Sequence, residues 1–168
     1  MAAEAVTLPK DRDIAGRRII EMTDSVGFDA TGAGWAFTKA TGTWRFYLFT
    51  TMADTKGPRW IWERLVKAFS KLPLPEGITP LDIVVASPNE ALYRSFPVKV
   101  ATGTLGVGAR ADVGESGEGD GDESGAPSDI DIFWLLRSRP EAALVRSVAL
   151  RNAAAQRFDT KVRQLLAA

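Results

Sequence analysis

The spacing of apolar residues divides the chain into three predicted helices and five predicted strands. Apolar residues three and four apart predict helices, at 8–24, 58–72 and about 139–166. Runs rich in aromatic and β-branched residues predict strands, at 35–39, 44–51, 81–86, 96–101 and 130–136. The predicted order of elements is therefore α-β-β-α-β-β-β-α.

This order predicts one α+β domain over residues 1–168, a length that suits a single core. Strands 35–39 and 44–51 form a hairpin through Gly42, and the second is apolar on both faces, which is typical of an interior strand. The irregular order and the lack of glycine-rich phosphate loops disfavour Rossmann and barrel folds. We expect a sandwich with a mixed or antiparallel sheet of about five strands and flanking helices, in which 96–101 pairs with 130–136.

Helical periodicity also predicts the buried face of the last helix. That face holds Leu144, Val148, Ala155, Phe158, Val162 and Leu165. Arg151 falls inside this apolar arc, so it should pair with a carboxylate or extend its stem to solvent. Ser138 and Glu141 have the spacing of a capping box at the start of this helix.

Charge is unevenly distributed along the chain. The twenty residues 112–131 hold eight acidic side chains and no basic one, whereas the rest holds all 21 Lys and Arg against 13 acids. A formal net charge of zero is thus a body of about +8 and a segment of about −8. The glycine content and like charges of 106–128 predict a mobile surface loop.

The chain contains no cysteine and no histidine. This excludes disulfides, thiolate nucleophiles, Cys/His zinc sites and histidine bases, so catalysis would need carboxylates, Lys, Tyr or an oxygen-ligated cation. The longest apolar runs are too short to span a bilayer, and no leader pattern opens the chain. We therefore expect a cytoplasmic protein with no membrane partner, and the oligomeric state stays open.

One face of the helix at 58–72 combines an aromatic ring with cations. Its predicted buried arc consists of Ile61, Leu65, Ala68, Phe69 and Leu72, and an outward strip holds Trp60, Arg64, Lys67 and Lys71. Such a strip can stack bases and neutralise phosphates. Further cations for it lie on the last helix, namely Arg146, Arg157 and Lys161. The alternative, favoured by the rarity of exposed large aromatics, is that Trp60 packs beneath the N-terminal segment or another subunit.

Two alternate aspartates, Asp129 and Asp131, precede an apolar strand and project from one face of it. This pattern resembles the D-x-D strand of nucleotidyltransferases, with 106–110 in place of that family's glycine-rich turn. The resemblance implies a divalent ion, such as Mg²⁺, held by Asp129 and Asp131, with Asp159 as a third carboxylate. The simpler interpretation, which we favour, is that acidic residues close a loop and enter an edge strand.

The acidic segment also carries part of a calcium-loop spacing. Asp120, Asp122 and Ser124 occupy positions 1, 3 and 5 of such a loop, and Asp131 occupies position 12. Pro127 and the aspartate at position 12 depart from the pattern, so loosely held hydrated cations are the favoured interpretation.

These observations favour a non-catalytic binding protein that needs no cofactor. Its basic helix faces would dock a nucleic acid, another polyanion or a protein partner, and the acidic loop would compete for them or form a second surface. One alternative is a metal-dependent nucleotidyltransferase that uses Asp129 and Asp131. Another is an acidic decoy that occupies the nucleic-acid groove of a partner.

Overall fold

The computed structural model confirms the α+β class, and its elements follow the predicted order with the addition of a short helix at 52–56 and a 3₁₀ turn. It describes residues 6–28, 30–90, 96–105, 129–138 and 148–168. The helices are α1 (Lys10–Ser25), α2 (Met52–Lys56), α3 (Pro58–Phe69) and α5 (Val148–Ala167), together with a 3₁₀ turn, η1 (Pro80–Asp82). The strands are β1 (Gly32–Thr38), β2 (Thr43–Phe49), β3 (Ile83–Ala86), β4 (Val98–Leu105) and β5 (Ile132–Ser138).

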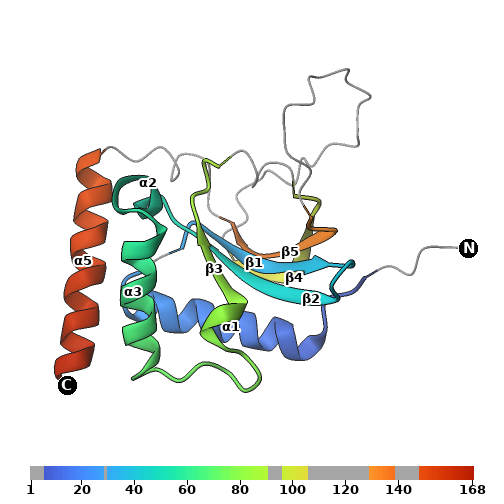
Figure 1. Ribbon diagram of the computed structural model, residues 1–168, viewed down its shortest axis with the longest axis horizontal. Coiled ribbons are helices and arrows are strands. Elements are labelled where there is room, and N and C mark those ends of the chain that lie inside the picture. Colours follow the sequence, from blue (N-terminus) through green and yellow to red (C-terminus); the bar gives the residue numbers. More distant parts are fainter. Residues whose placement is uncertain (1–5, 29, 91–95, 106–128, 139–147) are drawn as a thin grey trace, which may run out of the picture.

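The five strands form one mixed sheet in the order β3-β2-β1-β5-β4 (Figure 1). β1 is antiparallel to β2 and β5, whereas β2 pairs parallel with β3 and β5 pairs parallel with β4. The strands before and after the acidic segment therefore pair with each other, as predicted. β2 is an interior strand, as its two apolar faces indicate. β5 is also interior, so the prediction that Asp129 and Asp131 enter an edge strand is wrong.

A β-bulge in β5 turns one arginine toward the helices. Leu135 and Arg137 pair with consecutive residues of β1, so Leu136 is the extra residue. The bulge breaks the alternation of side chains, and Arg137 reaches Asp24 at the end of α1. Two hydrogen bonds, of 2.7 and 2.6 Å, join the guanidinium to both carboxylate oxygens. This bidentate pair joins α1 to the sheet and compensates a largely buried charge.

α1 lies close against the sheet because Gly16 carries no side chain. A Cβ atom at this position would lie 2.5 Å from Leu136 Cδ1 and 2.7 Å from the indole nitrogen of Trp35. That nitrogen donates a hydrogen bond of 2.7 Å to the carbonyl of Arg12, one turn earlier in the helix. The small residue and the hydrogen bond together set the position of α1 on the sheet.

The main core lies between one face of the sheet and the helices. α1 and α3 pack on this face, and α5 packs against α2 and α3 at the side of the molecule (Figure 1). Ala155, Phe158 and Val162 of α5 are buried as predicted, but Val148 is 63% exposed, so its predicted place in the core is wrong. No helix in the described ranges has the length and apolar character that crossing a membrane requires.

The opposite face of the sheet carries a smaller aromatic cluster. Phe49 and Phe133 are buried there, and Tyr47 is half-buried beside them. Phe96, just before β4, covers them, with its ring 5.4 Å from both Tyr47 and Phe133. The segment that leads into the edge strand β4 thus covers this face of the sheet, and the helices cover the other face.

Candidate functional site

Trp60 lies on the side of α3 that faces α5, and its side chain is half-buried. The Arg64 guanidinium carbon lies 3.6 Å from the centre of the indole ring. Phe158 of α5 contacts the ring edge-to-face, with centroids 6.2 Å apart. These cation–π and aromatic contacts make the indole part of the packing between α3 and α5. The ring face on which Arg64 lies is not open to a stacking base.

Arg64 and Asp159 form a direct ion pair between α3 and α5. Arg64 Nε donates a hydrogen bond of 2.7 Å to Asp159 Oδ1, and both side chains are only about one-fifth exposed. Arg163 NH2 lies 3.0 Å from the second oxygen of the same carboxylate. A pair this shielded from solvent is screened less than a surface pair. Two residues predicted for different sites, the docking strip and the metal triad, therefore meet in one interhelical contact.

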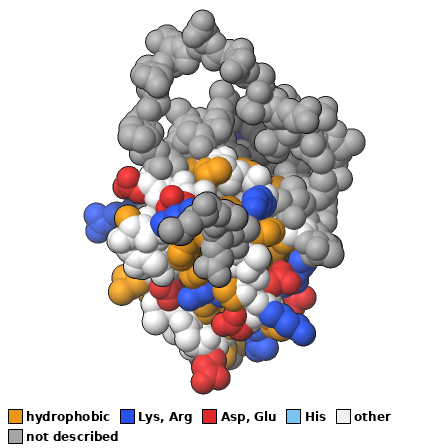
Figure 2. All heavy atoms as spheres, turned by 90° about the vertical axis from the view of Figure 1, so that its right-hand side faces the viewer, with side chains coloured by type: hydrophobic (Ala, Val, Ile, Leu, Met, Phe, Trp, Pro, Cys, Tyr) orange, Lys and Arg blue, Asp and Glu red, His pale blue; other side chains and the backbone are white. Residues whose placement is uncertain are grey.

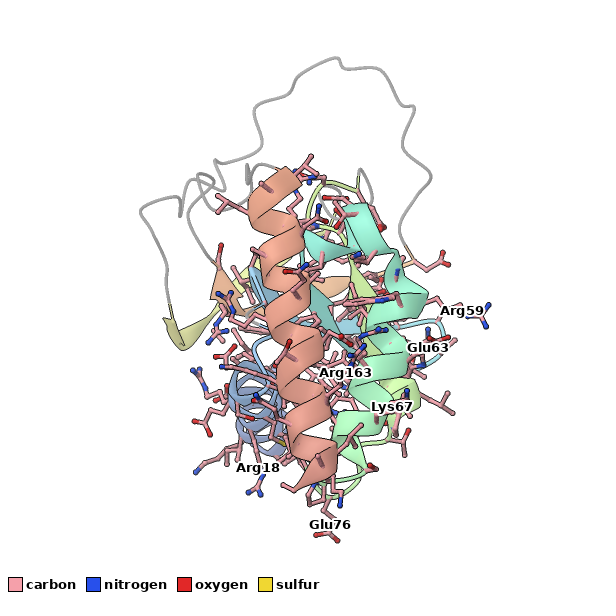
Figure 3. The ribbon with its side chains drawn as sticks, turned by 90° about the vertical axis from the view of Figure 1, so that its left-hand side faces the viewer. Arg18, Arg59, Glu63, Lys67, Glu76 and Arg163 are labelled. Atoms are coloured by element: carbon pink, nitrogen blue, oxygen red, sulfur yellow. The ribbon has the colours of Figure 1, made fainter. Side chains whose placement is uncertain are left out.

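The other predicted docking cations lie on the two flanks of α5. Lys67 and Lys71 are exposed in and just after α3, on one flank. Arg157 and Lys161 are exposed on the other, where a Cβ atom built on Gly27 would lie 3.1 Å from Lys161 Cδ. In Figure 3, Lys67 and Arg163 project on the α3 side of α5, and Arg18 projects from α1 on its other side. Arg146 is outside the described residues.

The distribution of charge differs between the two ends of the molecule. At the end opposite α5, basic and acidic side chains intermingle around small apolar areas (Figure 2). On the helical side, α5 contributes four cations and one acid, and residues 58–71 contribute four cations and one acid. The positive excess predicted for the body of the protein is thus concentrated, among the described residues, on α3 and α5.

Asp129 and Asp131 are both exposed, and Asp131 has a structural contact. Its Oδ2 accepts a hydrogen bond of 2.6 Å from the backbone amide of Lys39, in the β1–β2 turn. Its own amide donates to the carbonyl of Phe37, so both groups tie the start of β5 to the hairpin. The hairpin and α5, which carries Asp159, lie at opposite ends of the molecule (Figure 1). These three carboxylates therefore do not share a site.

The described residues contain no group of three or more side chains arranged to hold a metal ion. Asp120, Asp122 and Ser124, the predicted calcium ligands, lie outside the described residues, as does the predicted mobile loop at 106–128. The capping spacing of Ser138 and Glu141 also falls partly outside them. These remain predictions.

An apolar groove of about 450 Å³ lies between α3 and the η1–β3 segment, and the sequence did not indicate it. Pro58, Trp62, Pro80, Leu81, Ile83, Val84 and Val85 supply its apolar lining, and Arg45 and Arg59 are the charged residues along it. We call this the β3 groove.

Leu81 was predicted to start a buried strand, and this is wrong because it belongs to η1 and is 84% exposed. Asp82 Oδ2 accepts hydrogen bonds from the amide and the hydroxyl of Thr79, at 2.8 and 3.1 Å. These bonds close a turn that directs Leu81 outward. The Thr-Pro-Leu-Asp spacing was the available signal for that turn.

A polar network connects the ends of the parallel strands β2 and β3 to two helices. The Asp54 carboxylate of α2 accepts hydrogen bonds from the Ser87 hydroxyl at 2.5 Å and from the side-chain amide of Asn89 at 2.8 Å. Arg151 NH1, of α5, lies 4.0 Å from Oδ2 of the same carboxylate, which is the first of the two environments predicted for Arg151. Its Nε atom is buried without a hydrogen-bond partner among the described residues. The network holds α2 and α5 against the loop after β3.

No family model, curated protein or solved structure matches this chain.

Proposed function

We propose that the protein is a non-catalytic binding protein that docks a polyanionic partner on the exposed cations of α3 and α5. We call this surface the basic face, and it consists of Lys67, Lys71, Arg157, Lys161 and Arg163. The observation that carries the proposal is the concentration of eight cations against two acids on residues 58–71 and 148–167. Among the described residues at the opposite end of the molecule, basic and acidic side chains are instead intermingled (Figure 2).

Most cations of the basic face are available to a ligand. Arg163 shares Asp159 with Arg64, but Lys67, Lys71, Arg157 and Lys161 form no ion pair within the described ranges. Solvated cations of this kind bind phosphates by displacing their counterions, so the affinity depends steeply on salt. The two flanks are separated by the width of α5, about 10 Å, which a flexible polyanion can span.

The contacts of Trp60 change the expected mode of binding. Because Arg64 covers the indole and Phe158 contacts it, the proposal includes no stacked base. Binding should therefore rest on charge alone and show little preference among base sequences. A partner recognised in this way is a flexible polyanion, and single-stranded nucleic acid is the appropriate test ligand.

The test compares matched charge reversals at two ends of the molecule. Fluorescence anisotropy with a labelled single-stranded oligonucleotide would be recorded at several salt concentrations for wild type, Lys67→Glu and Lys39→Glu. Lys39 is an exposed lysine in the β1–β2 turn, so its reversal makes the same change in net charge away from the basic face. We expect Lys67→Glu to weaken binding on the order of tenfold at 50 mM salt and to lower the salt slope by about 0.7. Lys39→Glu should have little effect.

Two further results bear on the same experiment. Trp60→Ala should lower the melting temperature but leave the salt dependence unchanged, because the indole packs between helices. Equal effects of Lys67→Glu and Lys39→Glu, or no binding by wild type at 50 mM salt, would show that the basic face is not a docking surface.

A further inference from the structure

The β3 groove adjoins an unpaired strand edge. β3 is the last strand on its side of the sheet and pairs only with β2 within the described residues (Figure 1). An edge strand presents backbone N–H and C=O groups that can pair with an added strand. The edge spans four residues, with Pro80 before it and Pro88 after it. An added strand would therefore be short, and side-chain contacts would have to supply much of its affinity.

The groove beside this edge supplies such contacts. Leu81 projects from η1 with 84% of its surface exposed, and Trp62 of α3 lines the same groove. A leucine this exposed beside an aromatic and two prolines forms an apolar patch rather than an isolated apolar residue. An apolar side chain of a ligand would cover Leu81 and remove this surface from water.

The charged residues along the groove define the sign of the ligand. They are Arg45 of β2 and Arg59 of α3. Arg59 keeps 92% of its side chain exposed while its Nε bonds Glu63 at 3.2 Å, and Arg45 has no ion pair among the described residues. Two arginines without an acid in the lining favour a ligand with carboxylates. A second copy of this chain would bring its own Arg45 and Arg59 toward the same pair, which disfavours self-association through this edge.

We propose that the β3 groove binds an extended acidic segment of a partner protein. The segment adds to β3 as a strand of about four to six residues and pairs with its backbone. One of its apolar side chains packs on Leu81 and Trp62, and a flanking carboxylate pairs with Arg45 or Arg59. This surface is distinct from the basic face of α3 and α5, so it does not depend on polyanion binding there.

The test uses a phage-displayed library of random peptides selected on wild type. The selected sequences should alternate apolar and acidic residues, and synthetic copies should bind wild type in fluorescence polarisation. Leu81→Asp and Arg59→Glu should each weaken binding at least tenfold. Ile14→Asp is the matched control, because Ile14 of α1 is an apolar residue that is 59% exposed and does not line the β3 groove. Circular dichroism should be the same for all variants, since each changes an exposed side chain.

Peptide chemistry distinguishes strand addition from simple docking. N-methylation at every second residue should abolish binding in one frame and be tolerated in the other, because a strand pairs along one edge through alternate residues. The proposal is wrong if lysine replaces the acidic residues without loss, or if both methylation frames are tolerated. It is also wrong if no such peptide is selected, or if sedimentation shows a wild-type dimer that Leu81→Asp dissociates.

Discussion

Trp60 illustrates what helical periodicity can and cannot specify at the level of one residue. Of the predicted buried arc, Ile61, Leu65 and Ala68 are buried, and Phe69 and Leu72 are partly buried against the same core. That arc describes the contact with the sheet alone. A second contact, with Phe158 of α5, takes up the flank that carries Trp60. Its partner lies nearly a hundred positions further along the chain, so no local pattern could indicate it.

Tyr47 provides a prediction for the smaller aromatic cluster. Burial raises the pKa of its phenol above the ordinary value of about 10, with Arg45 lowering and Glu90 raising it to a lesser extent. A raised folded-state pKa means that the unfolded chain loses this proton first as pH rises. The contribution of protonated Tyr47 to the free energy of unfolding is therefore fully present below about pH 10, and it is lost as pH rises through the folded-state pKa.

Urea denaturation of wild type and Tyr47→Phe between pH 8 and 11 would check this. We expect the free energy of unfolding of wild type to fall more steeply than that of Tyr47→Phe above about pH 10. Groups that the two proteins share cancel in the difference. Parallel curves would mean that Tyr47 titrates alike in both states.

At the level of elements, the type and order of the main helices and strands and the antiparallel β1–β2 hairpin were predictable, but the directions of the other strand pairings were not. Apolar residues that recur every three or four positions in a helix, or every second position in a strand, indicate which side of the element is buried. They do not report that β4 runs parallel to β5, because this depends on where the connection returns to the sheet. The groove was missed for a related reason. Leu81 is apolar and was therefore predicted to be buried, whereas the turn closed by Thr79 and Asp82 exposes it.

The bulge in β5 leads to a specific prediction for Gly34 of β1. A Cβ atom at Gly34 would lie 2.2 Å from the backbone oxygen of Trp134, and a strand backbone cannot move aside without losing pairing. We expect Gly34→Ala to lower the free energy of unfolding by at least about 3 kcal/mol. Gly42→Ala is the matched control, because its Cβ meets nothing within 4 Å and only its φ of 63° is unfavourable. Its cost should be about 1 kcal/mol by thermal or urea denaturation. Equal losses would contradict a steric role for Gly34.

For the whole molecule, the two proposed surfaces differ in the ligand chemistry that they select. The basic face offers exposed cations on two helices, which suit a flexible polyanion and give little sequence selectivity. The β3 groove offers apolar contact, a strand edge and two arginines, which suits a specific peptide. Both would attract negative charge, so the acidic segment of the same chain is a potential competitor for either.

The last prediction concerns that competition. Deleting 114–128 removes five acidic side chains and raises the formal net charge from 0 to +5. Because β4 and β5 are parallel, the connection between them must span the length of β5, about 23 Å for its seven residues. The eleven residues left at 106–113 and 129–131 can reach about 36 Å. The melting temperature should therefore change little.

Oligonucleotide binding to the basic face should tighten at low salt in this deletion, and the difference should vanish at high salt as charges are screened. A full-length variant with Gln or Asn at the five acidic positions separates charge from length. It should match the deletion if the acidic side chains compete electrostatically. If the deletion tightens binding and the neutral variant does not, the segment obstructs the surface sterically. If neither changes binding, the acidic segment does not act on the basic face.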